Sequence, residues 1–361
     1  MKRVWLRAAA LALVVVGAVA GLTVYFSSET IPRCLVSGVR TWRPPTDGRT
    51  HRYEVVILDR SACFVDMDQQ QRLVGALPLS QAKWLSAAVP RVSDTLSVRD
   101  TEQGVAFMTR RGLLGVRVVD LHTNRTLYVT RFKGFTWNPR FGPDPPSHGL
   151  SLAPDRPELW VLDAPNSVVH VFDALSQAKW LSAAVPRVSD TLSVRDTEEG
   201  VAFMTRRGLL GVRVVDLHTN RTLDVTRFKG FTWNPRFGPD PPSHGLSLAP
   251  DRPELWVLDA PNGVVHVFDV SELPGRPPRR LEDIRLSKPI SGDESPCTRA
   301  CGRIGSLQHS ADGRFVYVGD AGDVIDVRTR EVVANLEALH NSRIQLEVDW
   351  VGGRAVFPPR S

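Results

Sequence analysis

The chain has 361 residues, a length that fits one large domain or two smaller ones. Its apolar fraction of 42% and charged fraction of 23% are typical of a globular protein, which excludes a disordered chain and a multi-span membrane protein. The net charge of +6 is compatible with nucleic-acid binding, but the arginines are spread along the chain without an accompanying aromatic-plus-basic motif. We therefore expect no nucleic-acid partner.

The N-terminus carries an export signature. Residues 1–7 contain three basic side chains, and residues 8–26 contain no charged one. A basic start before an apolar run directs the following chain across a membrane. As a helix, the run would span about 28 Å, close to the thickness of a bilayer core, which favours a retained anchor. The Ala-Val-Ala sequence ending at Ala20 is instead typical of a cleavage site.

We accordingly predict that residues 1–33 form a signal-anchor or signal peptide with a short linker. Residues 34–361 then form the folded domain, facing the periplasm or the cell exterior. The chain is held at the membrane by residues 8–26, or it is secreted after cleavage near Ala20.

Four cysteines follow the apolar run, an even number that permits disulfides in an oxidising compartment. Cys297 and Cys301 bracket a short polar loop and can pair locally, which leaves Cys34 and Cys63 for each other. Three pairings are possible, and the sequence does not choose between them. The spacing fits neither a zinc site nor haem attachment.

The middle of the chain is a tandem duplication. Residues 79–173 recur as residues 175–269, with differences only at Gln103/Glu199, Tyr128/Asp224 and Ser167/Gly263. This near-identity indicates a very recent duplication or an error of sequence assembly.

A shorter repeat of β-branched and aromatic strands, separated by turns, runs through both copies and beyond them. Its middle-strand positions are Ile57, Phe107, Trp160, Phe203, Trp256 and Tyr317. A period of about 40–50 residues in antiparallel strands is typical of propeller blades. We therefore predict an all-β propeller of four-stranded blades after one N-terminal hydrophobic helix. Six positions give at least six blades, and residues 34–50 with 338–361 are expected to form a seventh, mixed blade, with a ring of six blades as the alternative.

Several short motifs support this architecture. They are Ser147-His148-Gly149, Ala311-Asp312-Gly313, Tyr317-Val318 and Val324-Ile325-Asp326. Over about residues 50–340 the chain resembles the prokaryotic YVTN-type β-propeller repeat family, within the superfamily of WD-repeat-like and quinoprotein amine dehydrogenase β-chain-like propellers. The resemblance implies that Asp-Gly makes a hairpin turn and that the later Asp closes a strand-to-turn hydrogen bond. Residues 155–157 and 251–253 depart from it, because they read Asp-Arg-Pro.

The most distinctive candidate site is the loop at residues 134–149, which recurs at 230–245. Its aromatic and arginine side chains are of the types found in binding hot spots, and its prolines reduce the entropy lost on ordering. The candidate ligand- or partner-binding residues are Trp137, Arg140, Phe141, His148, Trp233, Arg236, Phe237 and His244. The competing interpretation is a connector between blades, with the two histidines in turns.

No catalytic motif, cofactor-binding motif or metal site is evident. Asp320, Asp323 and Asp326 faintly resemble a calcium loop, but a hairpin turn explains them better. We therefore expect a non-catalytic module that binds an envelope protein or polysaccharide. The alternatives are a propeller enzyme, such as a lactonase-like hydrolase or a quinoprotein-dehydrogenase-like subunit, and a duplicated gene product without activity.

Overall fold

The computed structural model describes residues 40–58, 61–78, 81, 96–98, 105–110, 113–120, 125–132, 149–152, 158–163, 168–173, 179–184, 189–196, 201–206, 209–216, 219, 221–232, 245–288, 290, 305–341, 345–356 and 358. The predicted apolar segment at residues 8–26 lies outside these ranges. Within them, no helix is long and apolar enough to cross a membrane.

The described strands form six antiparallel sheets. Sheet A contains β1 (His51–Leu58), β2 (Ser61–Asp66), β3 (Arg72–Pro78), β24 (Gln345–Val351) and β25 (Arg354–Val356). Sheet B contains β4 (Leu96–Val98), β5 (Val105–Arg110), β6 (Leu113–Asp120) and β7 (Arg125–Arg131). Sheet C contains β8 (Gly149–Leu152), β9 (Glu158–Asp163), β10 (Val168–Asp173) and β11 (Lys179–Ala184).

The second half of the chain forms the other three sheets. Sheet D contains β12 (Ser189–Asp196), β13 (Val201–Arg206), β14 (Leu209–Asp216) and β15 (Arg221–Arg227). Sheet E contains β16 (Leu246–Leu248), β17 (Glu254–Asp259), β18 (Val264–Asp269) and β19 (Arg279–Arg285). Sheet F contains β20 (Ser306–His309), β21 (Phe315–Gly319), β22 (Asp323–Asp326) and β23 (Glu331–Asn335). Two short 3-10 helices are η4 (Ala260–Asn262) and η5 (Glu337–Asn341).

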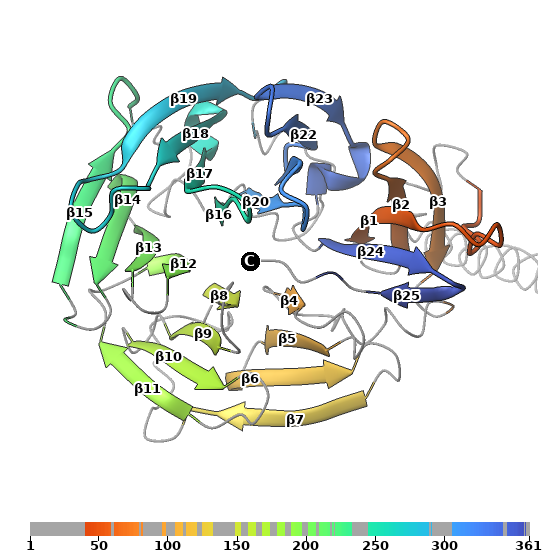
Figure 1. Ribbon diagram of the computed structural model, residues 1–361, viewed down its shortest axis with the longest axis horizontal. Helices are drawn as coiled ribbons and strands as arrows, with labels where there is room; N and C mark the ends of the chain where they lie inside the picture. Colours follow the sequence, from red (N-terminus) through yellow and green to blue (C-terminus); the bar gives the residue numbers. More distant parts are fainter. Residues whose placement is uncertain are drawn as a thin grey trace, which may run out of the picture.

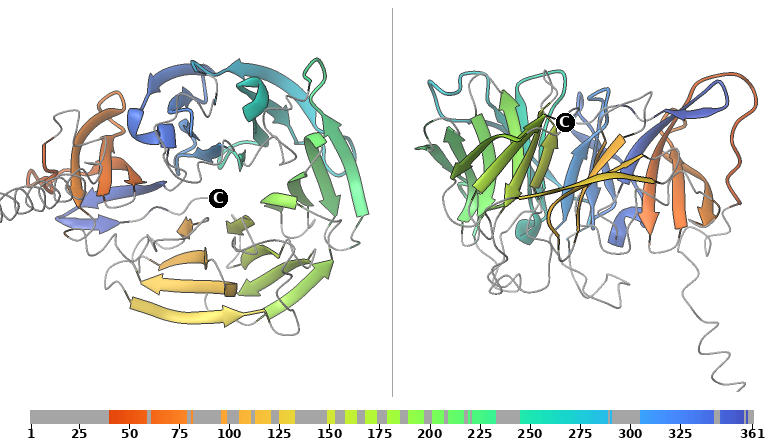
Figure 2. Two further views of the ribbon diagram at one scale, coloured as in Figure 1. Left: turned by 180° about the vertical axis from the view of Figure 1, so that it is seen from behind. Right: turned by 90° about the horizontal axis from the view of Figure 1, so that it is seen from below.

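The sheets are arranged around a central axis like the blades of a propeller (Figure 1). β4, β8, β12, β16 and β20 lie nearest the axis, and β3, β7, β11, β15, β19 and β23 form the rim. The innermost strands of successive sheets from B to F contact one another. Figure 2 shows the same ring from behind and from the side.

Apolar clusters lie between the faces of neighbouring sheets and hold the ring together. Val56 and Cys63 of sheet A pack with Tyr317 of sheet F. Other clusters join sheets E and F, sheets D and E, and sheets B and C. The six positions predicted to mark middle strands fall one in each sheet, on β1, β5, β9, β13, β17 and β21. A single sheet could not bury both of its faces by itself, so each sheet packs its apolar faces against its neighbours in the ring.

Sheet A unites the two ends of the folded domain. β24 pairs with β1 in antiparallel register, with Val55 opposite Leu346. The sequence had led us to expect a seventh blade built from the two ends of the domain. In the described residues the C-terminal hairpin instead joins sheet A. The apolar face explains the difference, because Leu346 and Val348 of β24 complete one buried cluster with Tyr53 and Val55 of β1.

The duplicated segments interlock rather than forming separate units. The first copy, residues 79–173, supplies three strands of sheet C and ends at the last residue of β10. β11, from the start of the second copy, completes that sheet. The second copy likewise ends at the last residue of β18, and β19, which lies outside the duplication, completes sheet E. Identical inner strands are thus paired with different outer strands.

Candidate functional site

All eight candidate side chains of the duplicated loop lie outside the described residues: Trp137, Arg140, Phe141, His148, Trp233, Arg236, Phe237 and His244. Of the two loop copies, residues 149, 230–232 and 245 are described. The strands that flank the loop are described. The first copy joins β7 at the rim of sheet B to β8 near the axis of sheet C, and the second joins β15 to β16 in the same way. The loop is therefore a connector between sheets by topology, and its two copies are two sheets apart in the ring.

Of the four cysteines, Cys63 lies in the described part of the chain. It is fully buried on β2 and is disulfide-bonded. Cys34, Cys297 and Cys301 lie outside the described residues, so the pairing predicted for them stays a prediction.

Aspartates close turns at the ends of strands. Oδ1 of Asp326, the last residue of β22, accepts the backbone N–H groups of Arg328 and Thr329, both at 2.9 Å. Asp66 makes the same pair of bonds at the end of β2. The two other aspartates of the faint calcium motif accept from other groups: Asp323 from the backbone of Ser287 at 2.7 Å, and Asp320 from that of Gly305 at 3.1 Å. The three carboxylates thus accept hydrogen bonds from different groups.

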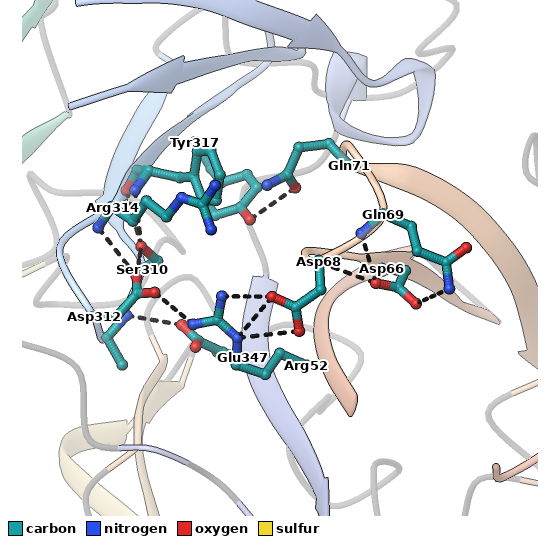
Figure 3. A network of polar contacts seen from close by, with 12 residues as sticks. Arg52, Asp66, Asp68, Gln69, Gln71, Ser310, Asp312, Arg314, Tyr317 and Glu347 are labelled. Carbon is teal, nitrogen blue, oxygen red and sulfur yellow. Dashed lines mark hydrogen bonds and ion pairs between the residues drawn. The ribbon is translucent and has the colours of Figure 1, made fainter. Parts of the chain in front are cut away.

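A polar network crosses the junction between sheets A and F, where the ring closes (Figure 3). The guanidinium of Arg52 on β1 donates to Asp68 at 2.8 Å and also to Asp312, which follows β20. Hydrogen bonding to Asp68 raises the pKa of Arg52 further. Asp312 also accepts the hydroxyl of Ser310 at 2.6 Å. Burial opposes ionisation of Asp312, but the bonds from Ser310 and Arg52 prevail and lower its pKa.

Two acidic side chains of β24 adjoin this network. Glu347 is buried and accepts the backbone N–H of Ala311 in sheet F at 2.8 Å. Asp349 lies two residues further along, on the same face of β24 and opposite Arg52 in the strand register. Burial, followed by the charge of Glu347, raises the pKa of Asp349 to about 6. One of its carboxyl oxygens, Oδ1, has no hydrogen-bond partner.

A serine–histidine pair joins sheets E and F. Ser247 Oγ of β16 lies 2.8 Å from Nδ1 of His309 on β20, and it also accepts the backbone N–H of His309 at 3.2 Å. Both residues are buried, and the His309 ring lies edge-on to Trp256. Burial lowers the pKa of His309 to about 3, so the imidazole is neutral at physiological pH.

A buried histidine occupies the same place in each copy of the duplication. His170 on β10 lies against Phe132, and His266 on β18 lies against Phe228, with ring centroids 4.0 and 4.1 Å apart. Nδ1 of His266 lies 2.7 Å from Oδ1 of Asp283 on β19. Nε2 of the same ring lies 3.4 Å from the buried Asp259. Burial lowers the pKa of His266, and the hydrogen bond to Asp259 opposes this.

Sequence reasoning missed these polar centres, for identifiable reasons. Arg52 and Asp312 are 260 residues apart and belong to no shared motif. The histidines carried a usable signal, since a polar residue between the apolar residues of the strand Val-Val-His-Val-Phe-Asp requires a buried partner. The Arg52 network, the Ser247–His309 pair and the His266 site each link neighbouring strands or sheets, and most of their polar atoms are hydrogen-bonded. Within the described ranges, no three His, Cys, Asp or Glu side chains are grouped so as to hold a metal ion.

No protein-family profile and no curated protein sequence matches the chain. Among solved structures, a chain of a nidogen/laminin complex is similar, with a TM-score of 0.52 and 10% identity over 85% of this chain and 100% of that one. At this identity the likeness shows the fold alone, and it supports a propeller-like arrangement.

Two weaker likenesses carry no argument of their own. Hydrazine synthase from Kuenenia stuttgartiensis gives a TM-score of 0.40 at 14% identity, over 70% of this chain and 60% of that one. This chain therefore matches less than two thirds of that protein's length. A functionally unknown protein from Desulfotomaculum acetoxidans gives 0.44 at 11% identity, over 76% of this chain and 75% of that one.

Proposed function

We propose that this protein is an exported, membrane-tethered propeller that acts as a non-catalytic binding module of the cell envelope. Its partner is an envelope protein or polysaccharide. The ring has six blades of YVTN type, one for each sheet of the described residues. Residues 8–26 hold it at the membrane, so that residues 34–361 face the periplasm or cell exterior.

The observation that carries the proposal is the disulfide at Cys63. Disulfides persist in oxidising compartments outside the cytoplasm and are rare within it. Cys63 is buried between sheets A and F, in the apolar cluster that includes Tyr317. Its position supports a structural role in a chain that folds after export, in agreement with the basic and apolar N-terminus.

The use of the polar side chains supports binding rather than catalysis. Arg52, Ser247 and His266 bond to groups on neighbouring strands or sheets and so stabilise the ring itself. A ring fixed in this way is a rigid platform for its connecting loops, and binding residues are often found on such loops. The duplicated connector at residues 134–149 and 230–245 is the proposed contact surface, with Trp137 and Trp233 as its principal side chains.

Localisation provides the first test. Protease added to intact spheroplasts should degrade the full-length protein, whereas a cytoplasmic marker stays intact. The protein should also sediment with membranes. Complete protection from the protease without membrane association would contradict export.

Binding provides the second test. Full-length protein purified in detergent should bind isolated cell-wall polysaccharide or an envelope protein, and Trp137→Ala combined with Trp233→Ala should weaken binding at least tenfold. Val333→Thr combined with Val351→Thr, at exposed positions outside the loop, is the control and should bind normally. Stoichiometric bound metal or quinone, or turnover of a lactone substrate, would contradict the non-catalytic assignment.

A further inference from the structure

The rim of sheet A shows how an outer edge of this ring accepts an additional extended segment. The backbone N–H of Trp42 donates to the carbonyl of Ala76 on β3 at 2.9 Å, and the N–H of Ala76 donates to the carbonyl of Arg40 at 3.1 Å. The bridge is parallel. Trp42 lies over Gly75, where an added Cβ would come within 2.7 Å of the tryptophan. It also stacks on Phe64 at 4.1 Å.

The rim strand of sheet B has the same local geometry as β3. In sheet A, Ala76 lies opposite Cys63, and the ladder is irregular just beyond the neighbouring pair Phe64–Gly75. In sheet B, Val129 lies opposite Arg117, and the irregularity falls just beyond Val118–Tyr128. Val129 of β7 therefore corresponds to Ala76 of β3. The N–H and C=O groups of Ala76 point outward to the added segment, so those of Val129 point outward too.

The exposed residues of β7 have a distinctive composition. Arg125, Leu127, Val129 and Arg131 are all exposed, with Leu127 and Val129 each at 45%. Because the ladder shifts register at Leu127, Arg125 lies on the opposite face of the strand from Val129 and Arg131. No described carboxylate pairs with either arginine side chain. We call these four residues the Arg-Leu-Val-Arg strip. Its two arginines are six residues apart, a separation of roughly 20 Å in an extended strand.

A charged edge strand can be explained as protection against aggregation. Protection alone, however, does not account for two adjacent exposed apolar residues between the charges, since such residues promote edge pairing. The strip instead combines outward backbone groups, a small apolar surface and two guanidinium groups that match carboxylates in geometry. These are the elements needed to recognise an extended acidic chain.

We propose that the outer edge of β7 binds an extended, acidic segment of a partner protein, which adds to sheet B as a further strand. Carboxylates near the two ends of the segment pair with Arg125 and Arg131, and apolar side chains between them cover Leu127 and Val129. The segment occupies the place that Arg40–Trp42 occupies on sheet A. This inference deepens the proposed binding function and rests on it.

The duplication supplies an internal control. β15 carries the equivalent residues Arg221, Leu223, Val225 and Arg227, all exposed in the same pattern. It differs from β7 only in having Asp224 where β7 has Tyr128. The additional carboxylate repels an acidic segment, so β15 should bind more weakly than β7. β23 exposes Val333 but begins with Glu331 in place of an arginine, and it should not bind.

The test uses full-length protein and a fluorescein-labelled, capped peptide of six residues, Glu-Val-Thr-Val-Thr-Glu, with fluorescence anisotropy as the readout. Added parallel to β7, as Thr41 is bridged to β3, the peptide places its valines on the side of Leu127 and Val129 and its glutamates opposite Arg125 and Arg131. Arg125→Gln combined with Arg131→Gln should weaken binding at least fivefold, and Arg221→Gln combined with Arg227→Gln should weaken it less than twofold. Tyr128→Asp should weaken binding, and Asp224→Tyr should create a second site of equal affinity. Arg125→Lys with Arg131→Lys keeps the charge and should retain part of the affinity.

Control ligands separate strand pairing from simple charge attraction. The same peptide methylated on alternate backbone nitrogens should not bind, because it cannot pair with the edge. A peptide with lysine in place of glutamate should not bind either. Equal binding of the methylated peptide, competition by an acidic polysaccharide at equal carboxylate concentration, or unchanged binding by the Arg125/Arg131 variant would overturn the proposal. If the peptide does not bind while envelope binding still depends on Trp137 and Trp233, the edge proposal fails and the proposed function stands.

Discussion

The hydroxyl oxygen of Ser247 and Nδ1 of His309 lie 2.8 Å apart across the boundary between sheets E and F. Because Oγ already accepts the backbone N–H of His309, its own proton is best directed to Nδ1. The imidazole proton then resides on Nε2, which is buried and has no partner. The alternative tautomer would leave the serine proton unpaired as well.

This pairing predicts an asymmetric response to mutation. Ser247→Ala leaves both ring nitrogens unpaired and should lower the free energy of unfolding by about 1–3 kcal/mol. Adding His309→Phe removes the unpaired imidazole, so the double variant should be more stable than Ser247→Ala alone. Urea unfolding measures both effects. Ser306→Ala on the same strand is the control, since that hydroxyl is already unpaired and its loss should have little effect. Additive losses in the double variant would exclude the coupling.

The raised pKa of Asp349 predicts an unusual dependence of stability on pH. Because its pKa is about 6 in the fold and 3.8 in the unfolded chain, the folded state binds more protons between these values. The contribution of Asp349 to stability is therefore greatest below pH 3.8 and is lost as the pH rises through about 6. Asp349→Asn should remove this decline and raise the free energy of unfolding at pH 8 by about 1 kcal/mol, after allowance for partial exposure.

Asp312→Asn is the comparison variant for Asp349→Asn, because the fold lowers the pKa of Asp312 and raises that of Asp349. Its ionised form is stabilised in the fold, so that contribution is present above the unfolded pKa and lost as the pH falls through the folded value. The variant should lose stability at pH 8. Chemical denaturation at pH 4, 6 and 8 measures both variants, and changes of the same sign at pH 8 would contradict the assignment.

The two copies of the buried histidine should differ in their importance. His266 faces Asp283 on β19, whereas the strand register places Ser182 of β11 opposite His170. His266→Leu removes a buried partner from Asp283 and should destabilise the protein by about 2–3 kcal/mol, and His170→Leu by about half of that. Thermal unfolding of the two variants gives the comparison. Equal losses would show that packing against Phe132 and Phe228, which is common to both, is the dominant contribution.

The disulfide at Cys63 should contribute substantially to stability. Treatment of the native protein with dithiothreitol, or Cys63→Ala, should lower the free energy of unfolding by about 2–5 kcal/mol. Peptide mapping of the non-reduced protein identifies the partner among Cys34, Cys297 and Cys301. An unfolding midpoint unchanged by reductant, with Cys63 alkylated in the reduced sample, would contradict a stabilising bond.

The local repeat made most of the ring predictable. β-branched and aromatic strands with turns at regular intervals located one middle strand in each sheet, from Ile57 to Tyr317, because these positions reflect local propensity and burial. The pairing of β24 with β1 was not predictable in the same way. It depends on which free edge the C-terminal hairpin meets in three dimensions, and several edges offer compatible alternation.

The polar centres depend even less on local sequence. The contact between Arg52 and Asp312 forms only when sheets A and F pack together, so the sequence around either residue does not predict it. Similarly, His170 and His266 lie in strands of identical sequence, and the outer strands that pair with them differ. The candidate side chains of the predicted binding loop lie outside the described residues, and the role of the loop stays a prediction.

The duplication boundary falls inside sheet C, between β10 and β11, and this position has an evolutionary consequence. Recombination between the two near-identical segments adds or removes 96 residues, the shift between residues 79 and 175. Such an event preserves every strand-to-strand junction present here, because each copy begins and ends at the same point in the repeat. The gene can therefore change the circumference of the ring in steps of two sheets without creating a new seam.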